Sequence, residues 1–251
     1  MFIHQPATVE RKAVIAHWFL LSFNGGVINA GGFLATGRFV SHVTGFATLF
    51  GIDMAKYKVD IAMGALTVPL FFLLGAFIAG FLIDRPLYQK KVPHFDWVMG
   101  LSALCLLTAA IAGKFEQFET FGGPTHLKKI YVLLALLCMA CGLQNGAITS
   151  SSGSSVRTTH LTGLTTDLGL GLARLTTYKA VDRRLKKETR ANWLRAGSII
   201  SFTLGSVVGA FLFLKVGYLG FLLPALIAAY ATWHGYQAKI TAHRQVLLDE
   251  G

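Results

Sequence analysis

Two stretches of the chain carry the same arrangement of hydrogen-bonding side chains. The pattern His-x-Thr-Gly-x-x-Thr-x-x-Gly occurs at residues 42–51 and again at residues 160–169. Imidazole and hydroxyl groups can hydrogen-bond a small molecule, and an imidazole can also relay a proton. The chain has no G-x-S-x-G motif, no H-E-x-x-H motif and no carboxylate pair, so the sequence does not predict an enzyme. No cofactor and no metal are predicted. The repeated pattern therefore predicts a binding site for a small molecule.

An asparagine precedes each of these stretches. Asn29 and Asn145 stand where an apolar segment gives way to a Gly- or Ser-rich link. The amide could bind substrate, or it could satisfy backbone groups freed by a broken helix. The Thr and Gly residues of each stretch are three or four positions apart, so they share one helix face. That face could line a cavity or only allow close helix packing. The predicted substrate-binding residues are Asn29, His42, Thr44, Thr48, Asn145, His160, Thr162, Thr166 and Asp167.

Asp167 and the two histidines also have structural alternatives. The histidines begin the predicted short helices, where an interfacial structural role fits them equally well. Asp167 has no counterpart in the first stretch, where Leu49 stands. A carboxylate at membrane depth is a candidate for function, with Arg157 and Arg174 as candidate partners. At a membrane surface it would be an ordinary solvated charge.

The elements that would position these residues are helices that cross a membrane. The chain of 251 residues is 53% hydrophobic and only 14% charged, with a mean hydropathy of +0.55. An uncharged apolar run of about 18–20 residues can cross the hydrocarbon core only as a helix. A soluble helical protein would need polar faces that these runs lack. The sequence predicts an all-α, polytopic membrane bundle with six full spans at 13–36, 61–83, 97–113, 130–149, 196–214 and 216–233.

The two polar stretches fall in segments too weak to be ordinary spans. We predict short helices near residues 41–55 and 158–173, which could be re-entrant, half-membrane or tilted segments. The link between the last two spans is very short, so an antiparallel hairpin is predicted there. Cys138 and Cys141 form a C-x-x-C spacing inside an apolar segment, where packing is the expected role.

Basic residues outnumber acidic ones, 23 to 12, and their placement predicts an orientation. The excess is typical of the cytoplasmic loops of a membrane protein, and nucleic acid is not a predicted partner. With the N-terminus inside, fifteen Lys and Arg fall on the cytoplasmic side and seven on the other side. A cytoplasmic N-terminus is also favoured if the two short segments cross the membrane. Both termini are therefore predicted to be cytoplasmic, in a bacterial inner membrane.

The sequence also predicts that the chain contains an internal duplication. The segment Gly26-x-x-Asn29-Ala30 matches Gly142-x-x-Asn145-Gly146, and each is followed by a polar stretch and an apolar span with a small-xxx-small pair. We predict two homologous halves, residues 1–122 and 123–251, in one integrated membrane domain. Three full spans in each half would make the halves inverted, whereas four would make them parallel. Matched interrupted segments in two halves indicate a transport site.

These residues resemble the YoaK family of bacterial membrane proteins, also called the DUF1275 family. The most specific matches are VSHVTGF in the first half and GLQN followed by THLTG in the second half. The resemblance covers nearly the whole chain and implies a six-span inner-membrane protein of a kind described as a transporter. Two positions depart from the family pattern: Asn29 stands where the family has Asp, and Phe46 where it has Asn. The first change removes a carboxylate that could couple transport to protons.

Three classes of function compete. A secondary transporter or exporter of an unidentified small molecule fits the duplicated halves and paired polar residues. A non-transporting scaffold or sensor, with the basic stretch 174–190 as its docking surface, is the alternative, and an intramembrane enzyme has the least support. The predicted partners are the lipid bilayer and a small-molecule substrate, and the sequence leaves a homo-oligomer open.

Overall fold

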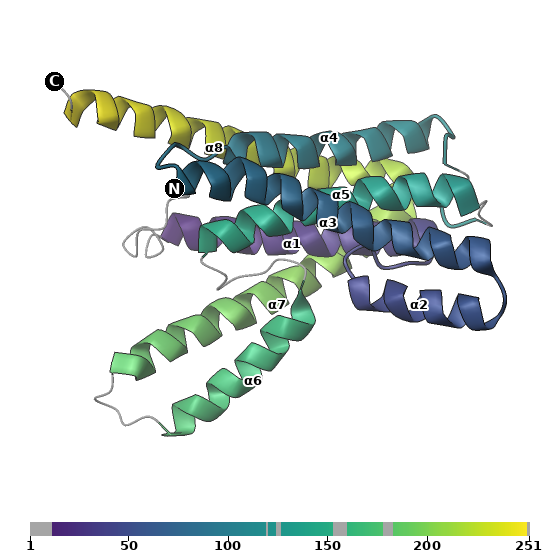
Figure 1. The fold of residues 1–251 in the computed structure, drawn as a ribbon, viewed down its shortest axis with the longest axis horizontal. Coiled ribbons are helices and arrows are strands. Elements are labelled where there is room, and N and C mark those ends of the chain that lie inside the picture. Colours follow the sequence, from purple (N-terminus) through teal and green to yellow (C-terminus); the bar gives the residue numbers. More distant parts are fainter. Residues whose placement is uncertain (1–11, 119, 124–126, 153–159, 178–182, 250–251) are drawn as a thin grey trace.

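The computed structural model of the chain is a bundle of helices (Figure 1). It describes residues 12–118, 120–123, 127–152, 160–177 and 183–249. The described residues contain no strand, as the all-α prediction requires. The elements are α1 (Lys12–Thr36), α2 (Val43–Ala55), α3 (Val59–Tyr88), α4 (Phe95–Lys114), α5 (Leu127–Ser152), α6 (Leu161–Thr177), α7 (Arg183–Val216), the 3₁₀ helix η1 (Gly217–Phe221) and α8 (Leu222–Asp249).

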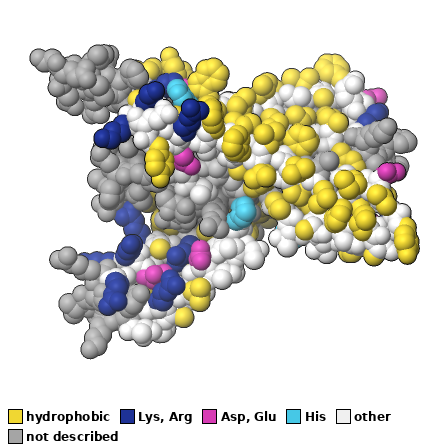
Figure 2. All heavy atoms as spheres, in the orientation of Figure 1, with side chains coloured by type: hydrophobic (Ala, Val, Ile, Leu, Met, Phe, Trp, Pro, Cys, Tyr) yellow, Lys and Arg dark blue, Asp and Glu magenta, His cyan; other side chains and the backbone are white. Residues whose placement is uncertain are grey.

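Five helical stretches of the described chain are long and apolar enough to cross a membrane. They are Ala13–Thr36, Val59–Tyr88, Phe95–Lys114, Lys129–Ser152 and Arg184–Thr241. Large apolar side chains cover much of the outer surface of the bundle (Figure 2). In water such a surface would be unstable, so a membrane protein is indicated. The last stretch includes α7, η1 and α8 without a break, where the sequence predicts two spans.

The predicted hairpin of the last two spans is wrong in its packing. Among the described residues α7 packs on α1 and α8 packs on α4, and no Cα atom of α7 lies within 8 Å of one of α8. The turn η1 lies between them and contacts α4 as well as α7. Its side chains Tyr218 and Phe221 are 7% and 0% exposed. Because these aromatic groups fill the space at the turn, the two helices diverge to different partners.

Small residues bring α1 and α7 into backbone contact. A Cβ on Gly26 would overlap the carbonyl oxygen of Phe202, and a Cβ on Gly205 would overlap the carbonyl oxygen of Phe23. In a membrane, helix association depends on such close packing, because lipid tails are as apolar as the helix surfaces. The pair α1–α7 is therefore held together by glycines that leave no room for a side chain.

The pair α3 and α5 has the same kind of interface. A Cβ on Gly142 of α5 would overlap the carbonyl oxygen of Phe72, and a Cβ on Gly75 of α3 would overlap that of Met139. Both interfaces join a helix from the first part of the chain to one from the second part. The two parts of the chain thus interlock instead of forming separate bodies.

The short helices predicted around the polar stretches are present as α2 and α6. Each begins partway along the bundle, and they run to opposite ends of it (Figure 1). α2 packs on α3, and α6 packs on α7. A Cβ on Gly171 of α6 would overlap the Asn192 side-chain oxygen, so glycine lets α6 approach the polar face of α7. On that face Arg195 donates to Glu188 and to Asn192 at 2.9 and 2.7 Å.

Candidate functional site

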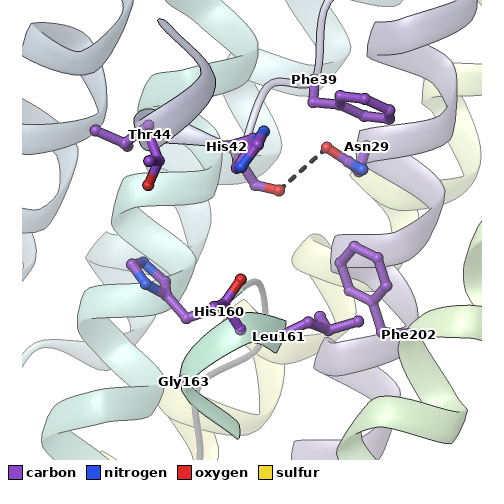
Figure 3. Close-up of a pocket in the computed structure, with 11 residues that line it drawn as sticks. Asn29, Phe39, His42, Thr44, His160, Leu161, Gly163 and Phe202 are labelled. Carbon is purple, nitrogen blue, oxygen red and sulfur yellow. Dashed lines mark hydrogen bonds between the residues drawn. The ribbon is translucent and has the colours of Figure 1, made fainter. Parts of the chain in front are cut away.

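A cavity of about 310 Å³ lies where the first turns of α2 and α6 approach each other beside α1 and α7 (Figure 3). His42 and Thr44 lie on one side of it, and His160 and Leu161 lie on the other. Its walls are Asn29, Phe39, Ser41, His42, Val43, Thr44, His160, Leu161, Thr162, Gly163 and Phe202. None of these side chains carries a formal charge, apart from what the two imidazoles acquire on protonation.

The loop between α1 and α2 positions the first wall. It carries the chain from the end of α1 back to the level of Asn29, which lies inside that helix. The Ser41 hydroxyl donates to the Asn29 side-chain oxygen at 3.1 Å, the bond drawn dashed in Figure 3. This bond occupies the Asn29 side-chain oxygen, and the amide nitrogen of Asn29, which also lines the cavity, can donate two hydrogen bonds.

Side chains from two helices hold that loop in place. The Cys138 thiol of α5 donates to the Val40 carbonyl at 3.0 Å. The Thr36 hydroxyl donates to the Gly32 carbonyl at 2.7 Å and accepts the Arg38 backbone N–H at 3.2 Å. Cys138 of the C-x-x-C spacing therefore has a structural role, and its neighbour Cys141 is buried as a free thiol.

The histidines stand at the starts of the two short helices, each against an aromatic ring. His42 lies edge-on to Phe39 with ring centroids 6.3 Å apart, and His160 lies 5.8 Å from Phe72. Both histidines are exposed residues, and both line the cavity. The two imidazoles lie on opposite walls of one space (Figure 3).

Two helix N-termini give the cavity a positive potential. His42 is the N-cap of α2 and makes no side-chain capping bond. The first backbone N–H groups of a helix have no partner within it, and its N-terminus carries a partial positive charge of about half a unit. Val43 and Thr44 open α2, and Leu161 and Thr162 open α6, and all four line the cavity. The first turns of both helices thus form part of the cavity walls.

The structure brings five of the nine predicted site residues to this cavity, namely Asn29, His42, Thr44, His160 and Thr162. The predicted convergence of the two stretches on one pocket is thus present for these five. Asn145 is 4% exposed in α5 and does not line the cavity.

The other three predicted residues lie on the exposed faces of the short helices. The hydroxyl of Thr48 donates to the Thr44 carbonyl at 3.2 Å, and that of Thr166 donates to the Thr162 carbonyl at 3.0 Å. Asp167 is exposed on α6 and does not line the cavity. Of its two predicted partners, Arg174 lies 3.7 Å from Glu188, and Arg157 is outside the described residues.

Several walls of the cavity were not predicted. Ser41 directly precedes the first histidine, so its position next to the repeated pattern was an available signal. Phe39 and Phe202 have no such signal, because neither belongs to the repeated pattern. Phe202 reaches the cavity through the packing of α7 on α1, which joins residues far apart in sequence.

Comparison with known proteins places the chain in a family. The family model described as "Protein of unknown function (DUF1275)" matches residues 17–233, which include the cavity and all of its walls. No curated protein and no solved structure matches the chain. Because the match spans most of the sequence, the chain belongs to the DUF1275 family.

Proposed function

We propose that the chain is a secondary transporter or exporter of a small molecule, with its binding site in the cavity between α2 and α6. One observation carries the proposal: two short helices that run to opposite ends of the bundle begin at one shared cavity. Interrupted or short helices that meet inside a membrane bundle are typical of transporter binding sites. The polar residues of the site come in matched pairs, His42 with His160 and Thr44 with Thr162.

We further propose six membrane-crossing helices arranged as two inverted halves. The glycine interfaces support this arrangement, because their members correspond under the sequence match. Gly26 of α1 contacts Phe202 of α7, and its counterpart Gly142 of α5 contacts Phe72 of α3. If α7 and α8 are counted as separate spans, each half has three long helices and one short helix. The first half is then α1–α4 and the second half is α5–α8. The odd number of full spans makes the halves inverted.

This arrangement suggests a way to move a substrate. Two related halves can rock about a fixed central site, so that the site opens alternately to the two faces of the membrane. In this mechanism α2 lies on the path to one face and α6 on the path to the other. Asn29, the histidines and the threonines would hold the substrate by hydrogen bonds while the path changes.

We expect both termini to be cytoplasmic, in an inner (plasma) membrane. Lys and Arg side chains gather at the end of the bundle where the C-terminus, the C-terminal part of α6 and the first turns of α7 lie (Figure 2). Cytoplasmic segments carry such an excess. A green fluorescent protein fused to the C-terminus should fluoresce in cells, whereas an alkaline phosphatase fusion there should be inactive. An active phosphatase fusion would reverse the orientation.

The transport proposal predicts a loss of flux on removing one imidazole. We expect His160→Ala to lower the uptake rate about tenfold, because a polar group of the substrate that loses its hydrogen-bond partner in the site costs about 1–3 kcal/mol. The measurement reconstitutes the purified protein in liposomes loaded with a mixed extract of cellular metabolites. Mass spectrometry then records which compound leaves or enters relative to empty liposomes. Asn29→Ala should give the same loss.

Thr203→Ala is the matched control for these variants. Thr203 is exposed on α7 and its hydroxyl bonds the Ile199 carbonyl at 3.0 Å, away from the cavity. Its flux should equal that of the unaltered protein. If no compound moves, or if His160→Ala and Asn29→Ala transport normally, the transport proposal fails. The alternative hypothesis, a scaffold that docks a partner at residues 174–190, would then be favoured.

A further inference from the structure

A second cavity adjoins the binding site on the side of α2. Its volume is about 230 Å³, and its walls are Gly37, Arg38, Phe39, His42, Gly45, Phe46 and Leu49. Phe39 and His42 line both cavities. We call this second cavity the α2 vestibule. Since two side chains belong to both spaces, they form the partition between the vestibule and the binding site.

Arg38 is the one formally charged residue among the walls of the two cavities. Its Nη1 atom is buried and makes no hydrogen bond within the described part of the chain. The ion pairs of the described residues do not include Arg38 either. An arginine keeps its charge at every physiological pH, and Arg38 is half-buried with one of its guanidinium nitrogens unpaired. The guanidinium group is therefore available to an anion that enters the vestibule.

The other side chains that line the two cavities add no negative charge. The walls contain no carboxylate. The helix N-termini of α2 and α6 add partial positive charge at the binding site. His42 and His160 are either neutral or positive, never negative. The guanidinium group and the two helix N-termini would repel a cation and attract an anion, and each imidazole would do the same when it is protonated.

The remaining walls suggest the shape of the ligand. Phe39 and Phe202 place apolar rings beside the polar groups of the site. The cavity volume is near the lower limit of ordinary ligand pockets, which begin at roughly 300 Å³. We propose that the site binds a small organic carboxylate with a short apolar body, and that Arg38 attracts it through the α2 vestibule. This inference rests on the transport function proposed above and names its substrate class.

Three probes of nearly equal size and different charge test the proposal. Benzoate is an anion, benzamide is neutral and benzylamine is a cation at neutral pH. Each is titrated into the purified full-length protein in detergent at one fixed ionic strength, because salt screens charge effects. Binding is measured by isothermal titration calorimetry and by the shift in melting temperature. We expect benzoate to bind at least about tenfold more tightly than benzamide, and benzylamine not to bind.

Variants of Arg38 distinguish an effect of its charge on benzoate binding from an effect on the fold. Arg38→Gln should weaken benzoate binding about tenfold or more, and Arg38→Lys should retain part of it, since a lysine keeps the charge but not the planar donor array. Lys56→Gln is the matched control, because Lys56 follows the other end of α2 and lines neither cavity. It should leave benzoate binding unchanged. A melting temperature without ligand, recorded for each variant, shows whether the fold is retained.

The proposal is overturned if benzoate does not bind, if benzamide or benzylamine binds as tightly, or if folded Arg38→Gln binds benzoate normally. Flux is measured separately in liposomes, so the two proposals can fail independently. Selective benzoate binding without flux of any compound would contradict transport and support the anion site. Flux of a cationic compound through the same cavity would support transport and overturn the anion site.

Discussion

Gly26→Val is expected to prevent recovery of folded protein. The Cβ alone would overlap the Phe202 carbonyl oxygen and lie 2.8 Å from the Ser206 backbone nitrogen. Both obstacles are backbone atoms of α7, so no side-chain rotation can relieve the overlap and the helices must separate. Overpacking a core costs about 1–3 kcal/mol or more. Here the loss extends along the α1–α7 interface, whose stability depends on close packing.

The measurement is the detergent elution profile of a fluorescent fusion, followed by its melting temperature. Gly142→Val should fail in the same way, because the Phe72 carbonyl oxygen blocks a side chain there. Gly51→Val is the matched control: no heavy atom lies within 4 Å of a Cβ at that position on α2. Its stability should change by less than about 1 kcal/mol. Normal elution and melting of Gly26→Val would show that α1 and α7 do not pack as described.

Gln144→Leu should strongly destabilise the bundle. Gln144 and Asn24 are both 0% exposed. The Asn24 amide donates to the Gln144 side-chain oxygen at 2.9 Å, and the Gln144 amide donates to the Leu21 carbonyl at 2.9 Å. These bonds join α5 to α1 in the middle of the bundle. Their loss leaves buried polar groups without partners, which costs about 1–3 kcal/mol each.

A double substitution distinguishes this hydrogen bond from simple packing. Once Asn24→Leu is combined with Gln144→Leu, both partners are apolar, so part of the lost stability should return. The free energy of unfolding is measured in mixed micelles for each single variant and for the pair. Gln237→Leu, at an exposed position of α8, is the control and should be nearly neutral. If the costs of the two single variants simply add, the bond contributes nothing to the fold.

Much of the candidate site was predictable because its residues repeat at matched positions. The imidazoles and threonines of the two stretches indicated paired polar groups, and α2 and α6 were predicted as short helices from their length and polarity. Five of the nine predicted residues meet at one cavity. Asn145 matches Asn29 in sequence and still lies away from the walls. Two residues at matched positions of the sequence therefore do not have to line the same cavity.

Arg38 was not among the predicted site residues, although its charge sets it apart in the sequence. It is the one formally charged residue between Lys12 and Asp53. The sequence places it near a membrane surface, where cations are ordinary, so its isolation carried no clear signal. Its buried Nη1 atom and its place in the wall of the vestibule follow from the way the α1–α2 loop folds back toward α1. Cys138 helps to fix that loop from a helix about a hundred residues away in the chain.

The sequence by itself determined that the chain is helical and apolar enough for a membrane, and which segments are long and which are short. These properties follow from local composition, since each helix satisfies its own backbone hydrogen bonds and its length sets whether it can cross. Only the tertiary structure decided which helices are neighbours. Lipid tails are as apolar as the helix surfaces, so hydropathy does not favour one helix partner over another. That choice depends on where two backbones can approach, as at Gly26 and Gly142. In the folded bundle α8 packs on α4 instead of α7, and the two polar stretches meet at one cavity.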